Sequence, residues 1–388
     1  MSKLEELIQQ YCPDGVEYKP LKDILRIRNG RDYKHLDKGL IPVYGSGGIM
    51  TYVDTPMYSK PSVLIPRKGS IDKLYYVDTP FWNVDTVFYT EIDTSKVVEK
   101  YVYYVLQKEH LEKLNTAGGV PSLTQGVLNE VLIPVPPLPV QEEVVRILDN
   151  FAELQAELQA ELQKRLQQYE YYRDKLLSFS DLSNWGGQEV SVEWKKLGEI
   201  ATLIRGGNFQ KKDFTESGVP CIHYGQIYTH FGIHTTSTLK YISPDVARKS
   251  KIAKTNDIIM AITSENVEDV GKCVAWLGDE DIAVSGHTAI IQHKQNAKYL
   301  SYYFHTSHFF TQKRRLAHGT KVIEISPKAL EDVIVPIPSL AEQQRIVEIL
   351  DRFDVLTSDI TAGLPAEIEA RRKQYEYYRD TLLTFKKK

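Results

Sequence analysis

The stretch QYEYYRDKLLSF at residues 168–179 returns almost unchanged as QYEYYRDTLLTF at residues 374–385. A second pair lies upstream, with LIPVPPLPVQEEVVRILDNF at 132–151 and IVPIPSLAEQQRIVEILDRF at 334–353. Matching segments in the same order are typical of a duplicated architecture. Because chance does not plausibly produce QYEYYRD twice, we interpret the chain as two diverged halves.

Each half, roughly 16–179 and 192–385, opens with a segment of mixed α+β character. Short β-like runs alternate there with turns rich in Gly, Pro, Asn and Asp. A Tyr-rich helix is expected in each half, around 97–114 and 297–316. The β-like runs are 62–65 and 86–89 in the first half, and 257–260 and 288–291 in the second. We therefore expect an α+β chain with two similar globular α/β-type domains.

A long helix is expected at the end of each half. Prolines prevent helix until about Val140, and no Pro or Gly follows from Gln141 to Phe179. The second copy, from about 341 to 385, is interrupted only by the sequence Gly-Leu-Pro that ends at Pro365. Since proline suits the first turn of a resumed helix, we predict a break or kink near 362–364.

Helices of this length need an apolar partner in water. Leucine-rich stripes supply one on each helix: Leu148, Phe151, Leu154, Leu158, Leu162 and Leu166 on the first, and Leu350, Phe353, Leu356, Ile360, Leu364 and Ile368 on the second. We expect the helices to pack antiparallel as a coiled-coil spacer, with the two halves related by a pseudo-twofold axis. The expected divisions are 1–139 and 181–338 for the two domains, and 140–180 and 339–388 for the two helices.

Composition limits the class of protein. The chain has 388 residues, of which 42% are hydrophobic and 26% are charged, so it can bury sizeable cores. No apolar run approaches the roughly 20 residues that span a membrane, and the acidic start does not resemble a signal peptide, so we expect a cytoplasmic protein with no membrane partner. The three cysteines have no metal-ligand spacing. The net charge of -3 means that nucleic-acid binding would depend on local basic patches.

The duplicated helix opening carries a resemblance to a known family. Its pattern, P-L-x-x-Q-x-x-V/I-x-x-I-L-D, occupies Pro137–Asp149 and Ser339–Asp351, and the second copy departs only by its initial serine. The QYEYYRD helix ends and the domain motifs Ile41–Gly48 and Gly218–His223 complete the pattern. Over essentially its whole length, the chain resembles the specificity subunit of a type I restriction-modification system.

The resemblance implies two target recognition domains, each of which reads one half of a bipartite site in double-stranded DNA. It implies that the long helices bind two methyltransferase (modification) subunits, and that restriction (motor nuclease) subunits join them. Adenine methylation with S-adenosylmethionine, and DNA cleavage with ATP and Mg, would belong to those partner subunits. No cofactor is expected in this chain.

The sequence agrees with a non-catalytic role. It contains no G-x-x-x-x-G-K-[ST] phosphate loop, no Asn/Asp-Pro-Pro-Tyr motif and no G-x-G-x-x-G. The glycine clusters Gly45–Gly48 and Gly206–Gly207 are better explained as turns. Two alternatives stay open at this point: a self-contained DNA methyltransferase or nuclease, and a coiled-coil scaffold that binds protein.

Basic and amide side chains in loops are the candidates for DNA contact, because such groups hydrogen-bond to base edges and neutralise phosphates. One cluster lies near the start of each half, at 26–34 and at 205–212. For these two clusters, we favour DNA contact over the simpler interpretation as solvated surface charges. The predicted DNA-binding residues are Arg28, Arg31, Lys34, Arg67, Lys68, Arg205, Asn208, Gln210, Lys211, Lys212, Gln226 and Lys321.

The tyrosines at the helix ends lie away from these loops. Tyr171, Tyr172, Tyr377 and Tyr378 are therefore predicted to pack between helices or against a partner subunit. Histidine pairs such as His305 and His308 have no evident third ligand, so packing or surface roles are favoured over metal binding.

The first long helix contains AELQAELQAELQ at residues 152–163, one four-residue unit written three times. Each unit adds about 6 Å of helix and a net rotation of roughly 40°, close to the twist of one DNA base pair. From Asp149 to Tyr169 is 20 residues, whereas from Asp351 to Tyr375 is 24, a difference of one unit. In the family that the chain resembles, repeat number is associated with the length of the unread spacer between half-sites. We therefore interpret the repeat as a molecular ruler, meaning that the number of units sets the spacer length between the half-sites. The simpler interpretation is a duplication that the helix tolerates.

Overall fold

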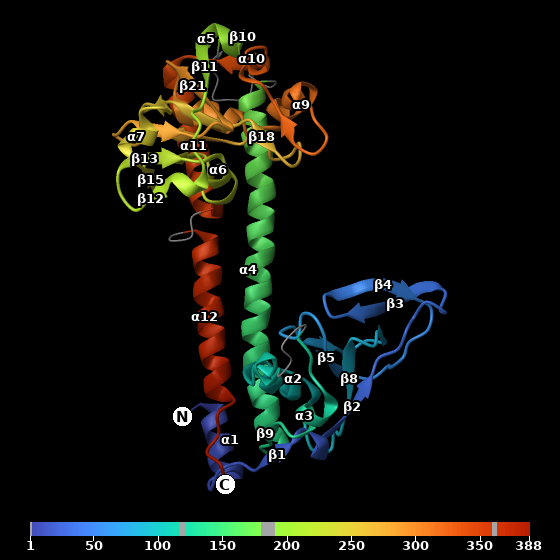
Figure 1. Ribbon diagram of the computed structural model, residues 1–388. Coiled ribbons are helices and arrows are strands. Elements are labelled where there is room, and N and C mark those ends of the chain that lie inside the picture. Colours follow the sequence, from blue (N-terminus) through green and yellow to red (C-terminus); the bar gives the residue numbers. More distant parts are fainter. Residues whose placement is uncertain (1, 116–120, 180–190, 359–362) are drawn as a thin grey trace. The chain divides into compact units, whose positions relative to one another are not determined.

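The computed structural model describes residues 2–115, 121–179, 191–358 and 363–388. They form two compact units, of which the first comprises Met1–Gln159 with Glu367–Lys388 and the second comprises Ala160–Ala366 (Figure 1). Each unit contains the mixed domain of one half together with a helical segment contributed by the other half. The domain boundary expected near residue 180 lies outside the described residues.

The first unit is built on two small sheets. One has the strand order β2-β8-β5-β6 and is antiparallel throughout, and the other has the order β4-β3-β7 with β3 and β7 parallel. Strand β5 is buried along its whole length, which explains its apolar run Val63–Pro66, and the one polar residue, Ser62, donates its hydroxyl to the Thr90 carbonyl at 2.8 Å. Helix α2 covers this sheet, since Tyr101 and Val105 share a buried cluster with Val63 and Phe88.

The elements of the first unit are α1 (Lys3–Tyr11), β1 (Tyr18–Pro20), β2 (Leu25–Asn29), β3 (Lys38–Gly45), β4 (Gly48–Val53), β5 (Ser62–Pro66), β6 (Tyr75–Val77), β7 (Trp82–Asn83), β8 (Val87–Ile92), α2 (Glu99–Lys108), α3 (Gln125–Asn129) and β9 (Leu132–Pro134), with short 3-10 turns at Leu21–Asp23 and Leu111–Leu114.

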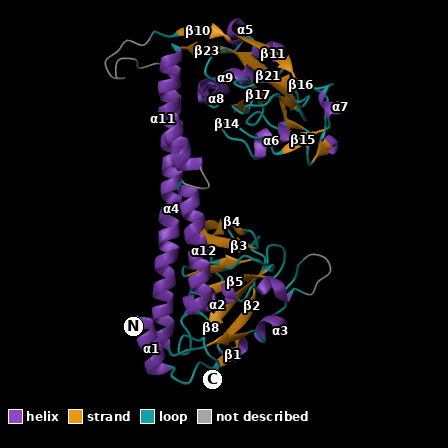
Figure 2. Cartoon of the chain, turned by 90° about the vertical axis from the view of Figure 1, so that its left-hand side faces the viewer, coloured by secondary structure: helices purple, strands orange, loops and turns teal. Residues whose placement is uncertain are grey.

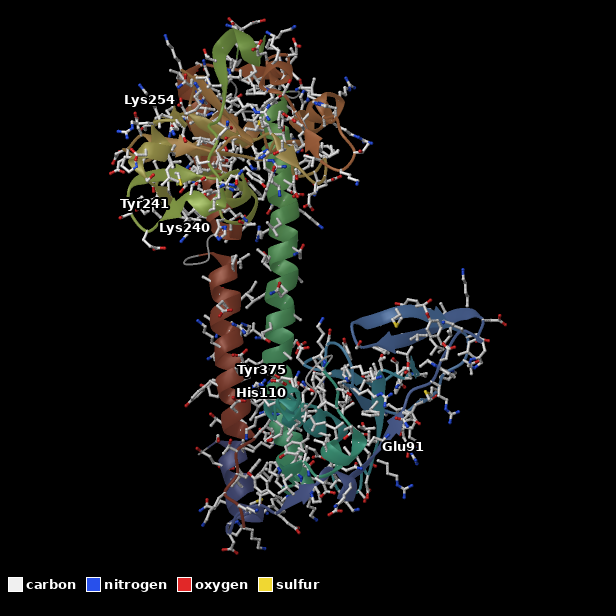
Figure 3. The ribbon with its side chains drawn as sticks, in the orientation of Figure 1. Glu91, His110, Lys240, Tyr241, Lys254 and Tyr375 are labelled. Carbon is white, nitrogen blue, oxygen red and sulfur yellow. The ribbon has the colours of Figure 1, made fainter. Side chains whose placement is uncertain are left out.

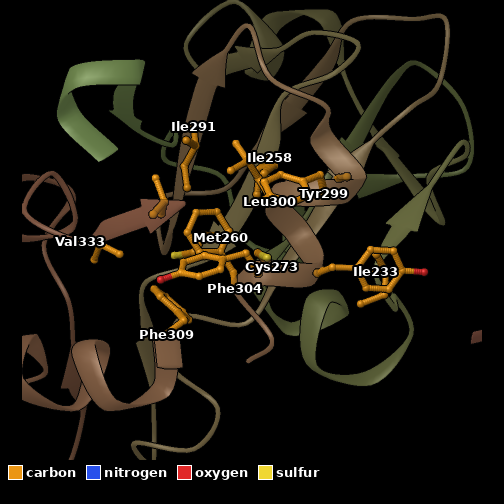
Figure 4. Packing of buried hydrophobic residues seen from close by; sticks show 14 of the residues in the cluster. Ile233, Ile258, Met260, Cys273, Ile291, Tyr299, Leu300, Phe304, Phe309 and Val333 are labelled. Atoms are coloured by element: carbon orange, nitrogen blue, oxygen red, sulfur yellow. The ribbon is translucent and has the colours of Figure 1, made fainter. Parts of the chain in front are cut away.

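The second unit has a larger version of the same plan. Its two five-stranded sheets have the orders β11-β21-β17-β19-β14 and β12-β15-β13-β20-β16. Helices α8 and α9 pack on the first of these sheets, where Tyr299, Leu300 and Phe309 meet Ile258 and Ile291 (Figure 4). The runs predicted as strands are confirmed in both units. The helix predicted around 297–316 is two helices, α8 and α9, and the one predicted around 97–114 is α2 followed by a 3-10 turn.

The elements of the second unit's domain are β10 (Glu193–Lys196), α5 (Leu197–Ile200), β11 (Ala201–Arg205), β12 (Phe214–Thr215), β13 (Val219–Ile222), α6 (Tyr224–Thr229), β14 (His234–Thr235), β15 (Lys240–Ile242), α7 (Pro244–Ala247), β16 (Lys251–Ala253), β17 (Ile258–Ala261), β18 (Thr263–Ser264), β19 (Cys273–Trp276), β20 (Ile282–Val284), β21 (Thr288–His293), α8 (Ala297–Tyr303), α9 (Ser307–Leu316), β22 (Ile323–Glu324), α10 (Pro327–Leu330) and β23 (Ile334–Ile337).

The long helices follow the sequence with one correction. Helix α4 is continuous over Leu138–Ser178, so it begins two residues before the predicted start, because Pro139 sits in its first turn, where no intrahelical N–H bond is lost. The second copy is two helices, α11 (Leu340–Ser358) and α12 (Leu364–Leu382), and Pro365 stands in the first turn of α12 as predicted. Residues 359–362, on which the predicted break partly falls, lie outside the described residues.

Within each unit, part of α4 packs against a helix of the other half (Figures 1 and 2). In the first unit, the ring of Phe151 stacks on Tyr378 of α12 with centroids 5.2 Å apart. In the second unit, Tyr172 stacks on Phe353 of α11 at 5.7 Å. The two stacks pair duplicated positions reciprocally, because Phe151 is equivalent to Phe353 and Tyr172 to Tyr378 in the repeats. One stripe residue departs from the prediction, since Leu356 is 38% exposed, and Ile360 lies outside the described residues.

A glutamine of the duplicated helix opening joins each domain to its helix. Gln141 is fully buried; it accepts a hydrogen bond from Val98 N (2.8 Å) and donates to the carbonyls of Lys96 (3.1 Å) and Pro136 (2.6 Å). Val98 is the N-cap of α2, so this side chain satisfies a backbone donor of that helix. Gln343 repeats the arrangement, with Asn296 N at 2.9 Å and the Pro338 carbonyl at 3.0 Å.

The aspartate of the same motif makes a second attachment. Asp149 accepts a hydrogen bond from the Tyr104 hydroxyl (2.5 Å) and forms an ion pair with the Lys100 ammonium (2.9 Å), and both of these partners are on α2. In the second unit Asp351 pairs with Tyr302 (2.7 Å) and Lys298 (2.5 Å) on α8. The spacing from glutamine to aspartate thus places both residues on the helix face that the domain covers.

Residues far apart in the chain complete the first unit. Val16 N donates to the Lys386 carbonyl at 2.8 Å, and the Tyr18 hydroxyl donates to the Phe385 carbonyl at 3.1 Å. Leu383 and Phe385 are buried in the same apolar cluster as α2. In the ranges that the structure describes, no helix is long and apolar enough to cross a membrane.

Candidate nucleic-acid interface

A turn held against a glycine is built in the same way in both domains. The second anchored turn, Val284–Thr288, joins β20 to β21, and the first anchored turn, Asn83–Val87, joins β7 to β8. A Cβ on Gly206 would lie 2.0 Å from the Ser285 carbonyl oxygen, and the same close approach, at 2.1 Å, occurs at Gly30. Because such a contact excludes any side chain, each turn rests directly on the backbone that leaves β11 or β2.

The backbone hydrogen bonds of the two turns correspond one to one. The second anchored turn has Gly206 N to Thr288 O (2.9 Å), Gly207 N to Val284 O (2.8 Å) and Ile262 N to His287 O (3.0 Å). The first has Gly30 N to Val87 O (3.2 Å), Arg31 N to Asn83 O (2.9 Å) and Arg67 N to Thr86 O (2.9 Å). Thr86 and His287 therefore occupy equivalent places in one backbone frame.

Arg205, the last residue of β11, lies beside the second anchored turn. Its Nε donates to the Gly286 carbonyl at 3.3 Å, and its Nη2 lies 2.9 Å from Glu324 Oε1. The side chain is 51% exposed, and an ion pair at that exposure contributes little to stability. Arg205 is therefore held in position by the turn while a phosphate or base could displace Glu324 at low cost.

An open groove of about 760 Å³ adjoins this arginine. It brings together Arg205, Asn208, Gln210 and Lys211 of the predicted set. Its lining residues are Arg205, Asn208, Phe209, Gln210, Lys211, His223, Tyr224, Gly286 and His287. A groove with cations, amides and aromatic rings along its walls has the chemistry to contact phosphates and base edges.

Aromatic side chains form one wall of the groove. The ring of Tyr224 lies edge-on to His287, with centroids 4.9 Å apart, and 4.4 Å from the ring of His223. Burial, with Lys211 and His287 nearby, lowers the pKa of His223 to about 4, so this ring is neutral near pH 7. The Thr263 hydroxyl lies 2.9 Å from His287 Nδ1, which fixes the orientation of the exposed His287 ring.

Three predicted residues of the second domain do not line the groove. Gln226 Oε1 accepts a hydrogen bond from His223 N at 2.8 Å, so its side chain is used in capping α6. Lys212 is exposed in the short helical turn next to Lys211, and Lys321 is exposed in the loop before β22. For these lysines, DNA contact stays a prediction.

Of the predicted cations that follow or lie in β2 of the first domain, one is paired with a carboxylate and two are exposed. Arg28 pairs with Glu91 at 3.0 Å on the sheet surface, and this hydrogen bond raises the pKa of the Arg28 guanidinium. Arg31 is exposed directly after Gly30, and its backbone N–H holds the first anchored turn. Lys34 is exposed in the loop that follows.

Arg67 and Lys68 lie on the opposite side of the first anchored turn from Arg31, next to Thr86. The Arg67 guanidinium is 5.4 Å from the centroid of the Phe88 ring. Its Nε is buried and has no hydrogen-bond partner in the part of the chain that the structure describes. A buried donor without a partner is costly, so this Nε adds to the cost of holding Arg67 against the Phe88 ring. Lys68 is exposed.

Comparison with known proteins places this duplicated arrangement in a family. A family profile described as "Type I restriction modification DNA specificity domain" matches residues 13–168 and 189–370. The chain belongs to this family. The two matched ranges cover most of the two halves recognised from the repeats, and the anchored turn lies inside each of them.

Relatives in the family are specificity subunits by name. The specificity subunit of the Escherichia coli type I restriction enzyme EcoR124I/EcoR124II is 35% identical over 77% of this chain and 74% of its own. A putative type I restriction enzyme specificity subunit from Haemophilus influenzae is 30% identical and covers 98% of each chain.

Solved structures share the fold of this family member. A chain from a study of complex assembly and conformational transition in the type I restriction-modification system has a TM-score of 0.61 at 16% identity, over 96% of this chain and 98% of that one. The S subunit from M. genitalium has a TM-score of 0.55 at 15% identity, over 96% and 97%. The predicted fold class, with its duplicated domains and long helices, is confirmed.

The four tyrosines predicted to pack between helices or against a partner subunit have two different environments. Tyr172 and Tyr378 stack on phenylalanines of the neighbouring helix, so they pack between helices. Tyr171 and Tyr377 are 59% and 68% exposed and touch the adjacent tyrosine edge-on. Large exposed aromatic side chains are frequent at protein interfaces, so partner binding stays a prediction for these two.

Sequence reasoning missed His287 as a residue of this interface. His287, Tyr224 and Thr263 come together only through the sheet pairing, and no local motif marks them. A signal was nevertheless present, because Gly30 and Gly206 occupy the same place after equivalent strand-like runs in the two halves. Among the described residues, no group of three or more His, Cys, Asp or Glu side chains could hold a metal ion.

Proposed function

We propose that this chain is the DNA sequence-specificity subunit of a type I restriction-modification complex and reads a bipartite target, one half-site with each domain. The observation that carries the proposal is the anchored turn, built with the same backbone bonds in both domains and flanked in each by exposed cations. Two equivalent frames with different side chains suit two different half-sites. Family membership supports the same function.

The chemistry is assigned to other subunits. Modification subunits, two per specificity chain, would methylate adenine with S-adenosylmethionine, and restriction subunits would cut DNA with ATP and Mg. The exposed Tyr171 and Tyr377 are the side chains we assign to modification-subunit contact. This chain would then contribute recognition and assembly, and no catalytic group.

The test uses the complex reconstituted from this chain and its modification subunits, with methylation of a randomised duplex library as the readout. Arg205→Ala is expected to weaken selection of the second half-site by about 1–3 kcal/mol, the range for a base contact by arginine, and to leave the first half-site unchanged. Lys254→Ala is the control, since it also removes one positive charge but lies exposed before β17, at the end of that strand away from the turn (Figure 3).

Equal effects of the two variants would contradict a base contact by Arg205. Methylation or cleavage of DNA by this chain alone would overturn the assignment of chemistry to partner subunits. A reconstituted complex without any sequence preference would overturn the proposed function itself.

A further inference from the structure

We propose that Thr86 and His287, at equivalent positions of the two anchored turns, are specificity-determining residues that read base pairs in the first and second half-sites respectively. This inference rests on the proposed function and goes beyond it, because it names the positions at which the two half-sites are distinguished. Neither residue belongs to a basic cluster, so charge alone does not point to them.

The first step is that the fold holds these positions without using their side chains. Each turn is fixed by the three backbone hydrogen bonds given above and by a glycine whose Cβ would collide with the turn at about 2 Å. The residue's carbonyl, not its side chain, accepts the bond from the neighbouring strand end, at Arg67 in one domain and Ile262 in the other. The side chain is therefore free to vary while the backbone is retained.

The second step is that the side chains around this frame differ between the domains wherever they reach solvent. Thr86 corresponds to His287, and Asp85 corresponds to Gly286. The strand that leads into the glycine ends at Asn29 in one domain and at Arg205 in the other. One backbone that presents different hydrogen-bonding groups is the arrangement needed to read two sequences with one fold.

The third step concerns the chemistry of His287. Its ring is exposed, yet it is oriented by Thr263 Oγ1 at Nδ1 (2.9 Å) and by the edge of Tyr224. Thr263 is itself fixed, because its carbonyl accepts a hydrogen bond from Tyr228 at 2.6 Å. With Nδ1 engaged, Nε2 is the ring nitrogen left to contact a base, as a donor or an acceptor according to the tautomer.

The fourth step concerns the first domain. Thr86 is partly buried, and a threonine can offer its hydroxyl to a base or its methyl group to thymine. Arg67, whose N–H holds the Thr86 carbonyl, carries the buried Nε that lacks a partner within the described ranges. That Nε has no exposed surface, so of these groups it is the partly exposed Thr86 side chain that is available to a base.

The experiment exchanges the two side chains. His287→Thr and Thr86→His are each assembled with the modification subunits, and the methylated sequences in a randomised duplex library are compared with those of the unsubstituted complex. Each variant is expected to change the base preference by about 10-fold or more within its own half-site and to leave the other half-site unchanged. Each exchange thus serves as the control for the other, and Lys254→Ala serves as the unrelated surface control. His287→Gln, which keeps length and polarity, guards against loss of folding in the larger change.

The outcomes separate the possibilities. Unaltered base preferences in His287→Thr and His287→Gln overturn the inference while the proposed function stands. A uniform loss over all sequences, with a weaker dependence on salt, shows a phosphate contact and also overturns it. An unsubstituted complex that selects no sequence fails the proposed function, and the inference fails with it.

Discussion

Replacing Gln141 by leucine tests whether the duplicated helix opening attaches the first domain to its helix. Leucine fills a similar volume, so the substitution removes hydrogen bonds without opening a large cavity. It leaves Val98 N without its side-chain partner, together with the carbonyls of Lys96 and Pro136. The Gln141 side chain that bonds to these groups is 0% exposed, so water does not readily take over its hydrogen bonds after the substitution.

The magnitude follows from the groups left unpaired. A buried donor without a partner costs about 1–3 kcal/mol, and under-satisfied carbonyls cost less. We therefore expect Gln141→Leu to lower the free energy of unfolding of the first unit by about 2–4 kcal/mol. In hydrogen exchange, this corresponds to roughly 30- to 900-fold lower protection of the α2 amides if they exchange through opening of the unit.

The assay is hydrogen exchange followed by mass spectrometry, with peptides from α2 and α8 read separately. Gln159→Leu is the matched control, because Gln159 is an exposed glutamine of the same helix, α4. Gln343→Leu should shift the loss of protection from α2 to α8. Protection of α2 equal to that of the Gln159 control would refute the reasoning, as would an equal loss in both units.

Three further predictions concern the spacer, pH and assembly. Deleting residues 156–159 removes about 6 Å of helix and about 40° of net rotation. Methylome mapping should then show both half-sites retained with a shorter spacer between them, and an unchanged spacer length would contradict the interpretation of the repeat as a ruler. Burial lowers the pKa of His223 and of His293 to about 4. The unfolded chain binds more protons below about pH 6.5, so the free energy of unfolding, measured by urea denaturation, should fall as the pH drops toward 4. The slope is up to about 1.4 kcal/mol per pH unit for each histidine, and His293→Gln should flatten it. Tyr377→Ala should weaken co-elution with modification subunits without changing stability, and unchanged assembly would contradict it.

The architecture could be predicted because duplication was visible in the residues that build it. The helix openings and the QYEYYRD ends keep their sequence, since they form the attachment and packing surfaces that both halves need. Strand-like runs such as 62–65 were recognisable because short runs of β-branched and other apolar residues stand between turn-forming residues. The start of α4 was misplaced by two residues because proline excludes helix interiors but not first turns.

The candidate interface was less predictable, for physical reasons. A sequence shows where cations are, but not which carboxylates lie across the sheet from them, so the pairing of Arg28 with Glu91 could not be foreseen. Gln226 was a reasonable amide for base contact until its capping role appeared. His287 lies far along the chain from Tyr224 and Thr263, and only tertiary pairing joins them.

The closure of the first unit by residues 383–388 has a consequence for biosynthesis. Tyr18 and Phe385, which share a hydrogen bond, are separated by 367 positions. At about 5–20 residues per second, a ribosome needs roughly 20–70 s to make that intervening chain. The second unit occupies the continuous segment Ala160–Ala366 and can fold before then. The domain translated first is therefore the one completed last, and until then the part of its apolar cluster that Leu383 and Phe385 cover stays exposed to water.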